Sequence, residues 1–197
     1  MTGSVPQLRF LVGPRELDRV ASMAATQLRD ILIPDQISPR GRGSVGWYSL
    51  PGVFFDLGPK LYLGVAGHEL DDGSEVFRIT LVGETDAPKV FDDSAWTRAA
   101  LSVTAIPLPQ DLGLGALLRF KPSVYLIRNR STLTARLAGV SLRADVQRDC
   151  ALLLTTTKST AVLFAVDDEL PYSLRATASM EHIASILDDP CTEVFLF

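Results

Sequence analysis

The chain ends on Cys191-Thr192-Glu193-Val194-Phe195-Leu196-Phe197, a stretch with the composition of a β-strand and no polar tail. Aromatic and β-branched residues favour strands. Ordering a chain terminus costs conformational entropy, so this segment is expected to be buried in its own sheet or against a partner. Val194, Phe195, Leu196 and Phe197 are therefore candidate interaction residues.

Working outward from this stretch, the sequence predicts helices near both ends of the chain. Residues 172–176 are strand-like, and residues 179–187 are helical. At the other end a strand at residues 8–12 precedes a helix that Pro14 opens and Pro34 ends, with apolar residues spaced along one face from Leu17 to Leu32.

Strand patterns dominate the region between these helices, and β-branched residues, period-two alternation and turn residues mark them. The expected strands are residues 52–57, 60–66, 75–82, 99–108, 116–121, 123–128, 134–146, 150–156 and 160–166. These patterns predict an α+β fold, mostly antiparallel β, with two main helices near the N- and C-terminal ends. We expect a single domain over residues 1–197, with a possible subdivision near the polar, acidic residues 84–95.

The composition narrows the classes of function. Of the 197 residues, 47% are hydrophobic, which predicts a large core or a buried interface. The longest apolar run, residues 161–166, is far short of the ~20 residues that span a bilayer, so no membrane partner is expected. The N-terminus lacks a signal peptide pattern, which predicts an intracellular (cytoplasmic) location or one within a viral particle. A net charge of −4 argues against a protein that coats nucleic acid, although a local basic face is not excluded.

Possible cofactor and phosphate motifs lie in one loop. Residues 41–46 match G-x-G-x-x-G, but no strand precedes them and no helix follows, so no cofactor is expected. Arg40 and Arg42 belong to the same loop and are kept as candidate interaction residues that could contact phosphate, beside the alternative of a solvated connector.

Metal and catalytic patterns are weak. The two histidines, His68 and His182, complete no zinc motif, and the two cysteines, Cys150 and Cys191, are expected to be small buried hydrophobes. Four Asp-Asp pairs occur at turn-like places, at residues 71–72, 92–93, 167–168 and 188–189. Aspartate favours turns, so turn formation is expected for each pair, and residues 167–169 are the choice if any pair binds a metal. We assign no catalytic, cofactor or metal residue.

Three functions are compatible with this sequence. The first is a non-enzymatic structural or interaction subunit of a larger assembly: a homo-oligomer, a viral or phage-type particle, or a multiprotein complex. The second is a small-molecule-binding or enzymatic β-rich domain, in which Trp47, Tyr48, Phe54, Phe55 and Tyr62 line a pocket rather than ordinary core. The third is a DNA sliding-clamp-like processivity factor, which the order of elements resembles. The absence of Lys and Arg from residues 179–187 weakens this last alternative.

Overall fold

The protein forms two β-sheets and three short helices in the computed structural model, which describes residues 7–34, 37–39, 46–58, 61–69, 75–83, 96–98, 112–137, 140–157, 159–167 and 173–197. Among these residues, all strand pairings but one are antiparallel. This confirms the α+β, mostly antiparallel β class that the strand patterns predict.

The larger sheet contains the terminal strand. Its members are β1 (Gln7–Phe10), β3 (Ser38–Pro39), β4 (Tyr48–Leu50), β9 (Ser123–Leu137), β10 (Val140–Thr155), β11 (Ala161–Val166), β12 (Leu174–Thr177) and β13 (Thr192–Leu196). The strand order is β13-β9-β10-β11-β12-β4-β3, and β1 pairs with β10 in parallel. The β13 strand thus lies at one edge of this sheet.

The smaller sheet and the helices complete the body. The sheet has the order β7-β6-β5-β2-β8. Its strands are β2 (Ile31–Pro34), β5 (Gly52–Gly58), β6 (Leu61–Glu69), β7 (Glu75–Gly83) and β8 (Trp96–Arg98). The helices are α1 (Pro14–Ala25), α3 (Leu114–Arg119) and α4 (Met180–Leu187).

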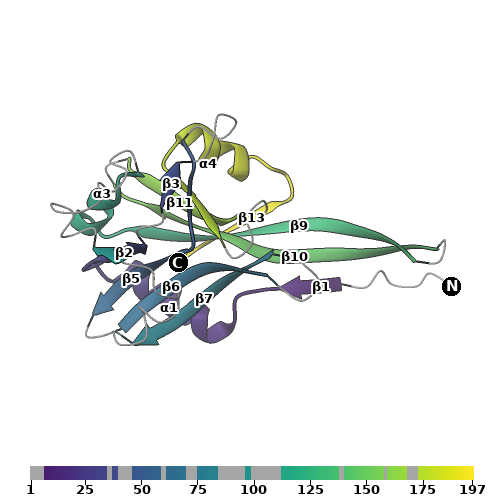
Figure 1. Ribbon diagram of the computed structural model, residues 1–197, viewed down its shortest axis with the longest axis horizontal. Coiled ribbons are helices and arrows are strands. Elements are labelled where there is room, and N and C mark those ends of the chain that lie inside the picture. Colours follow the sequence, from purple (N-terminus) through teal and green to yellow (C-terminus); the bar gives the residue numbers. More distant parts are fainter. Residues whose placement is uncertain are drawn as a thin grey trace.

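The body is layered, with the main core between the two sheets. Phe55 of the smaller sheet meets Phe164 of the larger one edge to face, with ring centroids 5.6 Å apart. Helices α1 and α3 add Val20 and Leu117 to this core. Helix α4 covers the opposite face of the larger sheet, where Ile183 belongs to a second core cluster. Figure 1 shows α4 above the larger sheet and β5, β6 and β7 below it.

Strands β9 and β10 are much longer than the body requires. Strand β9 has 15 residues and β10 has 16. The two strands stay paired along their length, from Ser123 opposite Thr155 to Leu137 opposite Val140. Among the side chains that the structure describes, the core clusters end at Ile127 on β9 and begin at Ala151 on β10, with half-buried Cys150 packed beside them. Beyond that point the two strands leave the body as a ribbon (Figure 1), with β1 beside β10 and the start of β13 beside Asn129 at the base of the ribbon. We call residues 129–137 and 140–148 the arm.

The first helix is shorter than its apolar spacing predicts. Helix α1 ends at Ala25, and Ile31–Pro34 form strand β2, so the prediction of one helix up to Pro34 is wrong. Thr26 already has an extended backbone, with φ −123° and ψ 145°. Ile31 and Ile33 are β-branched and fully buried in the main core, because β2 pairs with both β5 and β8. Tertiary pairing therefore overrides the helical spacing.

Two further predictions from the central region are wrong. Residues 116–121 are not a strand, because Leu114–Arg119 form helix α3 after Gly113, whose φ of 64° is left-handed. The separate strands expected at 123–128, 134–146 and 150–156 belong to the two continuous strands β9 and β10. The expected strand at 99–108 and the possible subdivision near 84–95 lie outside the described residues.

Candidate functional site

The candidate interaction residues of the terminal strand divide between two environments. Phe195 and Phe197 are half-buried and pack against the main core, and the Phe197 N–H donates to the carbonyl oxygen of Val124 at 3.0 Å. Val194 and Leu196 point outward, with 46% and 66% of their surface exposed. The outward surface of the edge strand is therefore formed by Val194 and Leu196, while the two phenylalanines stabilise the fold.

An ion pair marks the base of the arm. Arg128 Nε lies 2.7 Å from Asp149 Oδ1, and Arg128 Nη2 lies 3.3 Å from Oδ2. Asp149 is fully buried, and its Oδ2 also accepts the Val12 N–H at 2.7 Å. The Arg128 guanidinium carbon stands 4.6 Å from the centroid of the Phe195 ring. This one cluster joins β9, β10, the β1–α1 connection and the terminal strand.

A β-bulge positions that pair. The register of β9 and β10 shifts between Asp149 and Ala151, so Cys150 is the extra residue. Asp149 is opposite Arg128 as a result, whereas Cys150 and Ala151 pack with the α4 cluster. Sequence reasoning did not single out Asp149. The sequence feature that could have indicated Asp149 is its place directly before a strongly apolar strand segment. A carboxylate buried there needs a charged or hydrogen-bonding partner.

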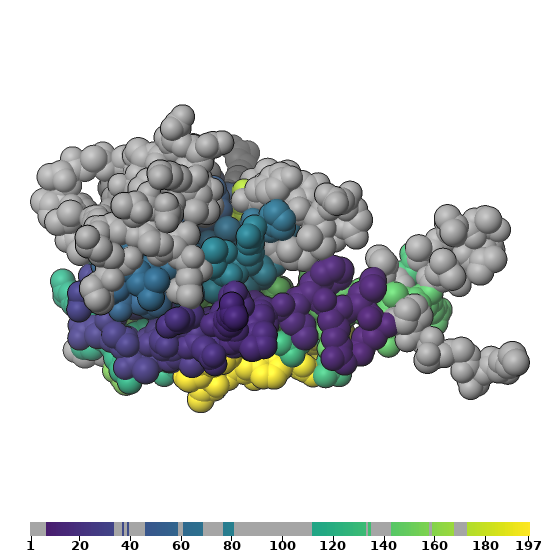
Figure 2. Space-filling model, turned by 90° about the horizontal axis from the view of Figure 1, so that it is seen from below, coloured from purple at the N-terminus to yellow at the C-terminus, as the bar shows by residue number. Residues whose placement is uncertain are grey.

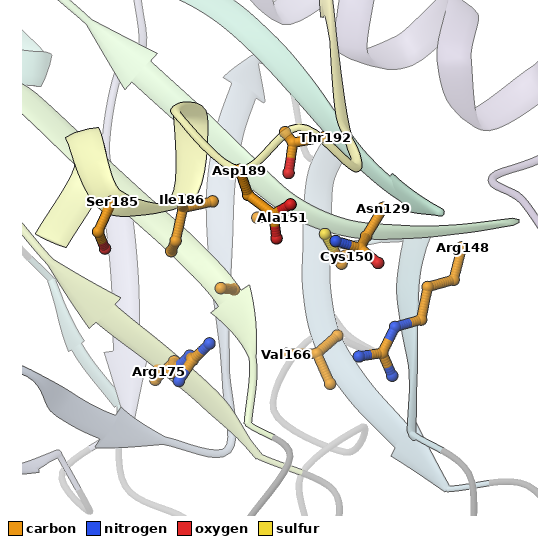
Figure 3. Close-up of a pocket in the computed structure, with 11 residues that line it drawn as sticks. Asn129, Arg148, Cys150, Ala151, Val166, Arg175, Ser185, Ile186, Asp189 and Thr192 are labelled. Carbon is orange, nitrogen blue, oxygen red and sulfur yellow. The ribbon is translucent and has the colours of Figure 1, made fainter. Parts of the chain in front are cut away.

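A cavity of about 170 Å³ lies between α4 and the larger sheet. Arg148 and Arg175 approach it from the sheet, and Ser185 and Asp189 from the helix and the turn that follows (Figure 3). A second cavity, of about 330 Å³, is formed beside the arm by residues that include Arg130, Asp145 and Cys191. Neither cavity was expected from the sequence.

The predicted loop and turn residues are only partly described. Arg40, Arg42 and the G-x-G-x-x-G loop before Gly46 lie outside the described residues, as do the Asp-Asp pairs at 71–72 and 92–93 and residues 168–169. Asp189 is a turn residue as predicted, since its Oδ1 accepts the Cys191 N–H at 2.8 Å. Asp167 is fully buried, and its N–H donates to the Ser173 carbonyl oxygen at 3.1 Å.

The histidines and cysteines form no metal site in the part of the chain that the structure describes. His182 stacks on Trp47, with ring centroids 5.2 Å apart, and His68 is half-buried on β6. Cys150 is half-buried, but Cys191 is exposed, so the expectation that both are buried is wrong for Cys191. Cys191 is exposed because it lies in the turn before the edge strand.

The aromatic residues considered as a pocket lining belong to the protein interior. Phe54, Phe55 and Tyr62 are buried, and Trp47 and Tyr48 are half-buried against the two core clusters. None of the five lines either of the two cavities above. Ordinary core packing therefore accounts for them.

No protein-family model, curated protein or solved structure matches the chain. Within the described ranges, no helix has the length and apolar character needed to cross a membrane.

Proposed function

We propose that this chain is a non-enzymatic subunit of a larger protein assembly, which its arm joins to a neighbouring subunit. The observation that carries the proposal is the extension of β9 and β10 beyond the last core residues. Figure 2 shows this end of the molecule from below as a space-filling view, with the purple atoms of β1 beside green atoms of the arm.

The arm has the pattern of a ribbon that buries one face. Apolar residues alternate with polar ones along both strands, at positions 133, 135 and 137 of β9 and 140, 142, 144 and 146 of β10. The backbone register sets Leu133 opposite Ala144 and Leu137 opposite Val140. A two-stranded ribbon is marginally stable in water, and alternation of this kind is typical of a sheet with one covered face.

Described polar side chains nearer the tip of the arm are exposed, whereas Asn129, Gln147 and Arg148 at its base are half-buried. Exposed side chains on both strands include Arg130, Thr132, Thr134, Arg143 and Asp145. The strand that flanks them is only 4 residues long, and its Leu8 is 39% exposed. The described apolar side chains of the arm, Ala144 and Val146, are only half-buried, and a neighbouring subunit that covers this face would complete their burial.

The edge strand offers a second contact surface. An edge strand presents unpaired backbone groups that readily pair with another chain, and apolar side chains beside them increase the tendency. Val194 and Leu196 are such side chains on β13. The sliding-clamp alternative gains no comparable support, because α4 has the sequence Met-Glu-His-Ile-Ala-Ser-Ile-Leu, without Lys or Arg.

The test is the absolute mass of the purified protein by light scattering across a concentration series. The comparison is a variant in which residues 132–145 are replaced by Asn-Gly, which favours a tight hairpin turn. We expect the wild-type mass to rise to that of a defined oligomer and the variant to stay monomeric with an unchanged melting temperature. A wild-type monomer at every concentration would contradict self-assembly, and equal masses of the two proteins would contradict a role for the arm.

A further inference from the structure

The cavity under α4 contains an arginine whose hydrogen bonding is incomplete. Arg175 Nε is buried and has no acceptor in the part of the chain that the structure describes. The guanidinium carbon of Arg175 lies 4.8 Å from the centroid of the Trp47 ring, and that ring stacks on His182. Arg175 is therefore held in place against an aromatic face while one of its donors remains unsatisfied. Buried donors are nearly always paired, so this donor indicates a missing acceptor.

A second guanidinium belongs to the same cavity. Arg148 reaches it from β10, next to the bulge, whereas Arg175 reaches it from β12. Figure 3 shows the two arginines on opposite sides of the space in that view, with Val166 between them.

The remaining lining favours an anion over a cation. Asp189 is the single carboxylate among the lining residues that the structure describes, and its Oδ1 already accepts the Cys191 N–H. Asn129, Ser185 and Thr192 add neutral polar groups that can donate hydrogen bonds. With two arginines and one aspartate, the described part of the lining has a formal charge of +1.

The size of the cavity suits a small ion. Its volume of about 170 Å³ exceeds what a single water needs and is too small for a nucleotide. Guanidinium groups bind carboxylate and phosphate oxygens through paired, charge-assisted hydrogen bonds. We infer that this cavity is a binding site for a small oxyanion of the phosphate or carboxylate type, held between Arg175 and Arg148. The inference does not depend on the proposed assembly.

Isothermal titration with sodium phosphate and, separately, with sodium malonate tests the site, with sodium chloride holding the ionic strength constant. We expect saturable binding of at least one of the two probes with one site per chain. Phosphate alone would identify a phosphate site, malonate alone a carboxylate site, and both a general oxyanion site. No saturable heat from either probe up to about 10 mM would overturn the inference.

Variants separate the cavity from general charge effects. Arg175→Gln is expected to weaken binding about tenfold or more, since it removes a charge-assisted donor pair. The control is Arg9→Gln, which removes an exposed arginine on β1 that donates to Gln7. Equal weakening by the two variants would overturn the inference. If Arg175→Gln does not fold, as judged by circular dichroism, Arg148→Gln replaces it and is held to the same comparison with Arg9→Gln.

Discussion

Asp149 is the single residue on which the junction between body and arm depends most. Its carboxylate is fully buried, pairs with Arg128 and accepts the Val12 N–H. Removing one partner of a buried ion pair leaves the other charge uncompensated. We expect Asp149→Ala to lower the free energy of unfolding by about 3–5 kcal/mol, measured by urea denaturation.

The matched control is Asp145→Ala on the same strand. Asp145 is exposed, and its nearest described partner is Thr132 Oγ1 at 3.4 Å. This substitution should change the free energy of unfolding by less than about 0.5 kcal/mol. Equal losses from the two variants would show that the Arg128–Asp149 pair contributes no special stability.

Alanine substitutions at two glycines are expected to change the stability of the fold in opposite directions. A Cβ on Gly67 would come within 3.0 Å of the Ser173 backbone, where the two sheets approach each other, whereas a Cβ on Gly115 of α3 would meet nothing within 4 Å. Gly67→Ala should therefore destabilise the protein by about 1–3 kcal/mol, because the backbone of Ser173 must move. Gly115→Ala should stabilise it by about 0.5 kcal/mol through the entropy of the unfolded chain. Thermal unfolding of both variants checks the signs, and a stable Gly67→Ala protein would refute the close approach.

At the residue scale the sequence predicts well which side chains are buried, but it predicts poorly which distant residues they contact. Phe55, Leu63 and Ile79 are core residues in strands that their alternation predicts. Gly67 and Asp149 were not recognisable, because the reasons for them lie in segments distant along the chain, at Ser173 and Arg128. No spacing rule within a short window brings such pairs together.

At the element scale, the edge strand β13 has one set of side chains that packs in the fold and another that is free to contact a partner. Val194 and Leu196 are exposed, while Phe195 and Phe197 pack against the core. We expect Val194→Ser with Leu196→Ser to keep the melting temperature within a few degrees and to raise the concentration at which oligomers form, measured by light scattering. Met180→Ser is the control, since Met180 is 60% exposed on α4, away from the sheet edge. A double variant that associates like the wild type and like Met180→Ser would exclude β13 from the interface.

Elements were predictable where local pattern and tertiary pairing agree. The alternation of β7 and the apolar run of β11 predict strands that the structure contains. The prediction failed at Ile31–Pro34, where an apolar spacing compatible with a helix is used by a strand paired on both sides. It failed again along β9, because the polar residues after Ile127 indicate a strand end in a globular body but continue a strand in a projecting ribbon.

At the scale of the whole molecule the arm should be the least stable paired region of the isolated subunit. Backbone amides that open without exposing a core exchange at low free-energy cost, whereas core strands exchange near the global free energy of unfolding. No arm side chain that the structure describes belongs to either core cluster, whereas Val124, Leu126 and Ile127 of β9 all do. Stability should therefore fall along β9 from the body to the tip of the arm.

Hydrogen exchange measured on the monomer and on the assembled protein tests this gradient and the proposed role of the arm together. In the monomer, amides of residues 130–137 and 140–147 should exchange much faster than those of residues 124–127, although all belong to the same two strands. In the assembly, the arm amides should become protected while the body amides keep their rates, because a neighbour that covers the arm adds the burial it lacks. An arm already protected in a proven monomer would show that the ribbon is stable alone, and it would remove the physical reason for a partner. An arm that still exchanges rapidly in the assembly would place the interface elsewhere.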